Sequence, residues 1–181
     1  DGIGGYEAFE NSGIKLSGKK IVVLGSGGAS RAICFTIAEK ADIQSLTIAG
    51  INQNEYENLA DDIKNKTGKN ISSNSMKKLP ELVSTCDIII NCTPIGMFPD
   101  DSNSPVPSSL LRSEIIVFDI VYNPIKTKLI KDAEKAGCRI INGTEMFINQ
   151  AVVQFTWWTG KKAPIELMRK VVFSELNKKA R

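Results

Sequence analysis

A strand, a glycine-rich turn and a helix follow one another near the start of the chain, and this order constrains the fold most strongly. Residues 21–24 (Ile-Val-Val-Leu) are apolar and mostly β-branched, as in a buried strand. The turn that follows is Gly25, Ser26, Gly27, Gly28 and Ala29. Glycines let the backbone turn sharply and approach a pyrophosphate, and a helix N-terminus offers free N–H groups. The order predicts a dinucleotide-binding turn; the alternative is a tight turn that binds no ligand.

Apolar strands alternate with helices along most of the remaining chain. Further strands are expected at 45–49, 71–76, 87–92, 115–121 and 139–142, and helices at 29–41, 55–66, 80–84 and 127–136. Such alternation indicates a parallel sheet with both faces covered. The predicted fold is therefore α/β: a Rossmann-like, doubly wound, mainly parallel sheet with helices on both faces. Extra terminal helices are expected at 1–11, 146–159 and 165–179, with Phe155, Trp157 and Trp158 serving as packing residues.

Composition narrows the possible functions. A net charge of +3 is too small to indicate a nucleic-acid partner, and no apolar run approaches the roughly 18 residues that span a bilayer. We therefore expect no nucleic acid and no membrane. Four widely spaced cysteines suggest reduced thiols in a cytoplasmic protein. The absence of histidine removes the commonest general base and metal ligand, so no metal is expected. Because the chain begins with Asp rather than Met, we expect further residues upstream.

Ligands of parallel sheets bind at the carboxyl ends of the strands. The segments that follow the predicted strands, and the first two residues of the chain, therefore carry most of the information on function. The informative ones are Asp-Gly at 1–2, the turn at 25–31, Asn-Cys-Thr-Pro-Ile-Gly-Met at 91–97, Asp-Ile-Val-Tyr-Asn-Pro at 119–124 and Gly-Thr-Glu-Met-Phe-Ile-Asn-Gln-Ala at 143–151. Together and in this order, they resemble shikimate dehydrogenase from end to end.

The resemblance implies an NADP-dependent oxidoreductase that interconverts 3-dehydroshikimate and shikimate on the route through chorismate to the aromatic amino acids. It implies that residues 1–181 form one Rossmann-like domain, the C-terminal half of a two-domain enzyme. The catalytic lysine of the family belongs to the other domain, so this chain alone is expected to be inactive. A small-molecule substrate and a monomer or homodimer are expected.

Individual site residues follow from the resemblance. Asp1 looks like the aspartate that pairs with the catalytic lysine and contacts substrate, and Tyr122 and Gln150 match substrate contacts. Thr93, Ile120 and Gly143 match positions at the nicotinamide end. Without the family, Asp1 would be interpreted as a solvated terminal residue, and the others as turn or packing residues.

The ribose end of the predicted site departs from the family. Where the family usually has Asn-Arg-Thr after the second strand, this chain has Gly50, Ile51 and Asn52, without arginine or acid. Local charge therefore selects neither nucleotide; NADP is the family expectation and NAD is possible. Asn52 or Arg31 is expected to contribute to a 2′-phosphate site. Ser30 replaces the third glycine of the turn, with a hydroxyl expected to contact phosphate.

Two other functions stay open at this stage. One is a quinate/shikimate dehydrogenase that uses NAD, which the missing arginine favours. The other is a non-catalytic nucleotide-binding module, which would not need Asp1, Tyr122 and Gln150.

Overall fold

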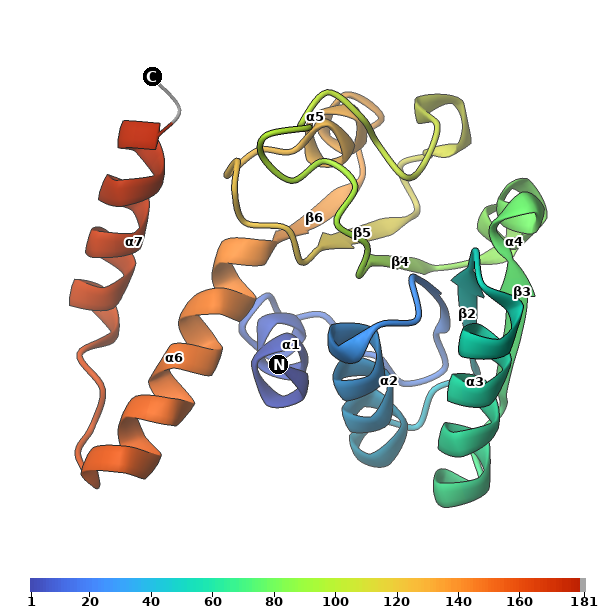
Figure 1. The fold of residues 1–181 in the computed structure, drawn as a ribbon, viewed down its shortest axis with the longest axis horizontal. Coiled ribbons are helices and arrows are strands. Elements are labelled where there is room, and N and C mark those ends of the chain that lie inside the picture. The colour runs from blue at the N-terminus through green and yellow to red at the C-terminus, as the bar shows by residue number, and fades with distance from the viewer. Residues whose placement is uncertain (180–181) are drawn as a thin grey trace.

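A computed structural model describes residues 1–179 and contains one six-stranded sheet in which all neighbouring strands are parallel. The strand order is β3-β2-β1-β4-β5-β6, so the chain winds outward from β1 in both directions (Figure 1). The bounds are β1 Lys20–Leu24, β2 Ser45–Gly50, β3 Ile71–Ser75, β4 Ile88–Asn91, β5 Ile116–Asp119 and β6 Arg139–Asn142. The predicted doubly wound α/β fold is confirmed.

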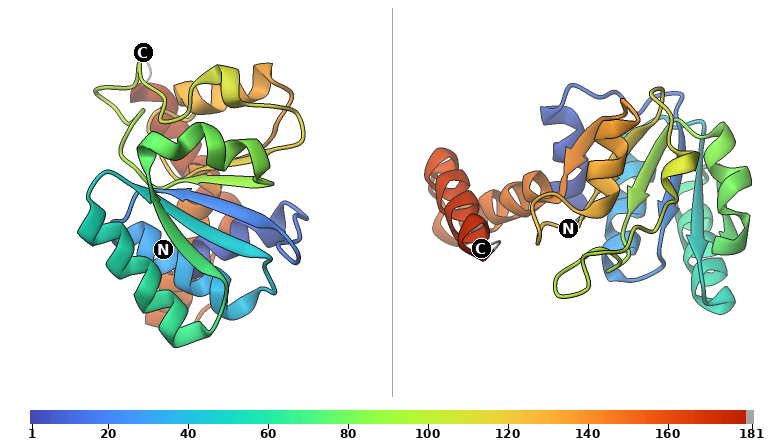
Figure 2. Two further views of the ribbon diagram at one scale, coloured as in Figure 1. Left: turned by 90° about the vertical axis from the view of Figure 1, so that its right-hand side faces the viewer. Right: turned by 90° about the horizontal axis from the view of Figure 1, so that it is seen from above.

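Helices cover both faces of this sheet, as Figures 1 and 2 show. Alternate strand residues point to opposite faces: Ile21 and Val23 belong to one apolar cluster, and Val22 and Leu24 to the other. The first cluster is completed by α1 (Gly2–Asn11), α2 (Gly28–Lys40), α3 (Gln53–Thr67) and α6 (Gly143–Thr159). The second contains residues of α4 (Leu79–Thr85) and α5 (Lys128–Lys135), and α7 (Ile165–Lys179) packs against α6.

Two predicted boundaries are wrong for identifiable reasons. β5 ends at Asp119, two residues early, where the side chain of Asp119 accepts a hydrogen bond from the backbone N–H of Val121. This bond turns the chain out of the sheet. The helix α6 begins at Gly143, three residues before the expected start and directly after β6.

The expectation that Trp157 and Trp158 are packing residues is also wrong. Their exposed fractions are 72% and 79%. The buried residues of α6 lie between Gly143 and Asn149, and the second half of the helix extends beyond the sheet (Figure 1). Phe155 is only partly buried.

Cysteine burial agrees with the expectation of unpaired thiols. All four cysteines are free; Cys34, Cys86 and Cys138 are buried, and burial raises the pKa of the Cys34 thiol to about 12. Within residues 1–179, no helix is both long and apolar enough to cross a bilayer. The same residues contain no group of three or more cysteine or acidic side chains that could hold a metal ion.

Candidate functional site

The glycine turn has a geometry that suits a pyrophosphate. Gly25 adopts a φ of +99°, and a Cβ there would lie 3.2 Å from the Cys92 carbonyl, so the sharp turn requires glycine. Gly27 is the N-cap of α2 and provides no side-chain cap. A Cβ at Gly27 or Gly28 would meet nothing within 4 Å, so the space before the first turn of α2 is open. Its backbone N–H groups are therefore available to an anion.

Ser30 keeps only one of its two expected roles. It is fully buried, and its hydroxyl lies 3.7 Å from the Cys34 sulfur, which preserves the close packing of α2 on the sheet. Because the hydroxyl is buried inside the fold, the expected contact with phosphate is wrong.

A cavity of about 530 Å³ extends from this turn to the ends of β4 and β5. Predicted cofactor-binding residues on its wall are Gly27, Gly28, Ala29, Thr93 and Ile120, and Tyr122 joins them. Met97 and Phe98, which the sequence analysis did not single out, add exposed apolar surface. The cavity thus combines an open helix N-terminus with apolar surface, which suits a nicotinamide dinucleotide.

A second cavity of about 150 Å³ brings the predicted substrate residues to the same place. Asp1, Tyr122 and Gln150 line it together with Ile120 and Gly143. Ala29, Ile120 and Tyr122 border both cavities, so the substrate side and the nicotinamide side adjoin. With Ala29, six of the predicted residues, from four separate segments of the chain, therefore meet.

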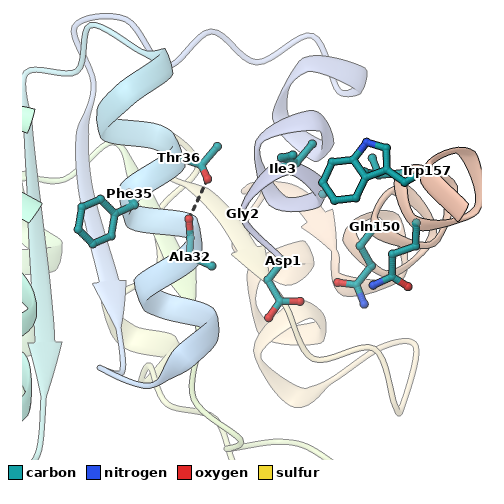
Figure 3. Close-up of a pocket in the computed structure, with 11 residues that line it drawn as sticks. Asp1, Gly2, Ile3, Ala32, Phe35, Thr36, Gln150 and Trp157 are labelled. Atoms are coloured by element: carbon teal, nitrogen blue, oxygen red, sulfur yellow. Dashed lines mark hydrogen bonds between the residues drawn. The ribbon is translucent and has the colours of Figure 1, made fainter.

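Glycines in α1 explain how Asp1 comes close to Gln150. A Cβ at Gly4 would lie 2.9 Å from the Met146 carbonyl and 3.0 Å from the Gln150 backbone nitrogen, so α1 and α6 are in backbone contact. Asp1 is the N-cap of α1, so this helix contact places Asp1 near Gln150. Asp1 and Gln150 also line a third cavity of about 370 Å³, drawn in Figure 3 with Trp157 and Thr36 at its wall.

Two further contacts position the site. The ring of Tyr122, which is 39% exposed, stacks on Phe147 with centroids 4.4 Å apart. A Cβ at Gly143 would lie 2.4 Å from the Ile120 carbonyl oxygen, so only glycine allows α6 to start there. The sequence analysis did not identify Phe147, because its role depends on a tertiary contact.

Asp119 is a buried carboxylate behind the strand ends. It accepts hydrogen bonds from the Asn91 amide at 2.9 Å, from the Thr127 hydroxyl at 2.6 Å and from the Val121 N–H at 3.1 Å. Burial nevertheless raises the pKa of Asp119 to about 6, while the three hydrogen bonds oppose that shift. The Asn91 side-chain oxygen also accepts hydrogen bonds from the N–H and the hydroxyl of Thr93. These bonds fix the position of Thr93, which lines the larger cavity.

The ribose end of the site differs from expectation in its charge. Ile51 is 94% exposed and offers no polar group. Asn52 donates to one Glu55 carboxylate oxygen at 2.9 Å, and the Ser26 hydroxyl donates to the other at 3.2 Å. An acid that the sequence analysis did not single out therefore lies beside the glycine turn. Arg31 is paired with Asp62 on α3 at 2.8 Å.

Comparison with known proteins identifies the family. The sequence model described as shikimate / quinate 5-dehydrogenase matches residues 7–124, and that of the shikimate 5′-dehydrogenase C-terminal domain matches residues 143–173. The chain belongs to the shikimate/quinate dehydrogenase family. The resemblance inferred from the strand-end motifs is confirmed.

Relatives of known name cover nearly the whole chain. It is 37% identical to the shikimate dehydrogenase (NADP(+)) of Methanosarcina barkeri over 97% of its length, but spans only 62% of that relative. A shikimate dehydrogenase crystallised with NADP+ superposes with a TM-score of 0.86 and 34% identity, over 97% of this chain and 61% of that one. Shikimate 5-dehydrogenase from Listeria monocytogenes, crystallised with shikimate and NAD, gives a TM-score of 0.87 and 31% identity over 95% and 62%. Family members have thus been solved with either nucleotide.

Proposed function

We propose that this chain is the C-terminal, cofactor-binding part of a two-domain shikimate dehydrogenase. The complete enzyme would reversibly reduce 3-dehydroshikimate to shikimate with a nicotinamide dinucleotide. The observation that carries the proposal is the small cavity in which Asp1, Tyr122 and Gln150 meet Ile120 and Gly143. The chain's 62% share of its M. barkeri relative supports the two-domain organisation.

Each residue has a role that its chemistry supports. The Asp1 carboxylate would hold an ammonium group of the upstream domain beside the reacting oxygen, which fixes the position of a transferable proton. The Gln150 amide and the Tyr122 hydroxyl would bind substrate oxygens. Ile120 and Gly143 would form a close apolar wall that excludes water. The bound nicotinamide supplies or accepts the hydride.

The nucleotide would occupy the glycine turn and the larger cavity. Gly25 to Ala29 would hold the pyrophosphate, Gly50 to Asn52 would border the adenosine ribose, and Thr93 the nicotinamide ribose. The M. barkeri relative is named for NADP, and the structural neighbours contain NADP or NAD. The proposed function therefore covers a nicotinamide dinucleotide of either kind, acting with a small-molecule substrate in the cytoplasm.

The decisive experiment measures shikimate oxidation by the full-length enzyme with NADP+ and with NAD+. We expect turnover with shikimate, and a raised KM for shikimate in Gln150→Ala; Gln44→Ala, at an exposed position before β2, is the matched control. Residues 1–181 alone should bind nucleotide without turnover. Oxidation of shikimate by that isolated chain would contradict the assignment of the catalytic lysine to another domain.

Quinate is the second candidate substrate, because the matching family description includes quinate dehydrogenases. Comparison of kcat/KM for quinate and shikimate in the same enzyme separates the two. If neither is oxidised while nucleotide still binds, the chain is a nucleotide-binding module and the proposed activity is refuted.

A further inference from the structure

We propose that Glu55 selects the nucleotide of this enzyme, favouring NAD over NADP by accepting the ribose 2′-hydroxyl and repelling a 2′-phosphate. This inference rests on the proposed function only in placing a dinucleotide on the glycine turn. It concerns the adenosine end of the site, away from the cavities at β4 and β5.

The fold carries Glu55 to that end of the site. β1 and β2 are neighbours with Leu24 opposite Ala49, so the loop that follows β2 lies beside the glycine turn that follows β1. In dinucleotide-binding folds of this topology, the end of the second strand meets the adenosine ribose. Asn52 caps α3 at this point, and Glu55 lies in the first turn of the helix.

Two hydrogen bonds position the Glu55 carboxylate, one from the glycine turn and one from the N-cap of α3. Its Oε2 accepts from the Ser26 hydroxyl at 3.2 Å and its Oε1 accepts from the Asn52 amide at 2.9 Å. Ser26 belongs to the phosphate-binding turn itself, so the carboxylate is tied to the segment along which the nucleotide would lie. Each carboxylate oxygen retains a lone pair for a further donor, which a ribose hydroxyl can supply.

The local charge opposes a phosphate at the same point. A phosphate monoester carries about −1.5 to −2 charges near neutral pH, and would face a like charge at Glu55. Within residues 1–179, none of the observed ion pairs includes Glu55, and the nearby Arg31 is held by Asp62. Ile51, the exposed residue directly after β2, adds no positive charge.

A purely structural role for Glu55 makes a different prediction. Asn52 at the N-cap and Glu55 three residues later have the spacing of a capping box. An acid in the first turn also interacts favourably with the helix dipole. If that were its only role, replacing Glu55 would lower stability and change the binding of both nucleotides alike. If Glu55 selects the nucleotide, the ratio of the two affinities changes.

The test compares dissociation constants of the full-length enzyme for NADH and NADPH by nucleotide fluorescence. Competition by 2′,5′-ADP and by 5′-AMP isolates the ribose end, because neither probe contains nicotinamide. Glu55→Gln keeps the shape and removes the charge. Glu57→Gln removes the same charge from an exposed position of the same helix, two residues on and therefore on a different side.

We expect the unmodified enzyme to bind NADH more tightly than NADPH. Glu55→Gln should tighten binding of NADPH and 2′,5′-ADP by roughly tenfold, equivalent to about 1.4 kcal/mol, and weaken NADH. Glu57→Gln should leave the ratio unchanged. Adding Ile51→Arg to Glu55→Gln should increase the preference for NADPH further, because the guanidinium supplies a phosphate partner.

The outcomes separate this inference from the proposed function. Tighter binding of NADPH by the unmodified enzyme, or an equal effect of Glu55→Gln on both nucleotides, overturns the role of Glu55 alone. A preference for NADH without oxidation of shikimate supports the role of Glu55 and refutes the proposed activity. Failure to bind either nucleotide overturns both.

Discussion

The side-chain amide of Asn91 donates a 2.9 Å hydrogen bond to the buried carboxylate of Asp119, and this bond joins the ends of β4 and β5. The same carboxylate accepts from Thr127, the N-cap of α5. One buried acid therefore connects two central strands and a helix directly behind the larger cavity.

Removal of the Asn91 amide should destabilise the protein strongly. Asn91→Ala removes one of the three hydrogen-bond donors of the buried Asp119 carboxylate, and also removes the acceptor for the N–H and hydroxyl of Thr93. We expect a loss of at least about 2 kcal/mol in the free energy of unfolding. Urea titration measures it. Asn58→Ala, at an exposed position of α3, should change stability little; equal losses in both variants would contradict the role of this network.

Asp119 should also give stability a specific pH dependence. Its pKa is about 6 in the fold and is expected near 3.8 when unfolded, so the native state binds the extra proton between these values. The contribution of Asp119 is therefore complete below about pH 4 and is lost as the pH rises through about 6.

Comparison with Asp119→Asn isolates this effect, because the amide does not titrate. The unfolding free energy of the unmodified protein, minus that of the variant, should fall by about 2 to 3 kcal/mol between pH 4 and pH 6. It should be flat above that range. A difference that rises with pH would mean that burial does not raise the pKa of the Asp119 carboxyl.

Gly143 should tolerate no side chain. The Cβ of Gly143→Ala would lie 2.4 Å from the Ile120 carbonyl oxygen, so α6 must move away from β5. We expect about 3 kcal/mol of destabilisation, measured by thermal or urea unfolding. Gly28→Ala is the control, since its Cβ meets nothing within 4 Å and alanine favours the helix. An unchanged stability in Gly143→Ala would contradict the close contact.

Gly27 should show the opposite behaviour. Gly27→Ala places a methyl group in open space before the first turn of α2, at a φ of −77° that alanine adopts readily. Stability should therefore fall only slightly, by no more than about 1 kcal/mol, because alanine is less favourable than glycine at an N-cap. Binding of NADH should weaken several-fold, because the methyl group occupies the approach of the pyrophosphate. Isothermal titration measures the change; unaltered affinity would exclude this turn as the phosphate site.

Salt should reduce the discrimination attributed to Glu55. Raising the ionic strength from about 0.1 M to about 1 M shortens the screening length from about 10 Å to about 3 Å, and Glu55 is exposed. The ratio of NADPH to NADH dissociation constants should therefore move toward one. Titrations at both ionic strengths provide the measurement, with Glu55→Gln as a control whose ratio should respond less. A constant ratio in the unmodified enzyme would argue against charge repulsion.

The sheet and the location of its site could be predicted because local sequence encodes them. Apolar strands at regular spacing determine the parallel sheet, and the carboxyl ends of those strands determine where Tyr122 and Thr93 gather. Glu55 could not be found in this way. It lies in a helix beyond the strand end, and only the contact with Ser26 assigns it to the ribose side.

The exposure of Trp157 could not be predicted either, because it also depends on the tertiary arrangement. Aromatic residues in a helix predict burial only when the sheet extends beneath them, and the sheet ends before the second half of α6 (Figure 1). The length of a helix relative to its sheet is a global property, which residue spacing along the chain does not contain.

The absence of a side chain at Gly143 fixes the distance between the start of α6 and the chain at Ile120. Backbone lies against backbone there, so α6 cannot slide along β5 as two surfaces of flexible side chains could. A substrate bound to Gln150 and a nucleotide bound at the end of β1 would then rest on one rigid frame. The separation between hydride donor and acceptor on this side of the site would be set when the chain folds, and no loop of this domain would have to close to establish it.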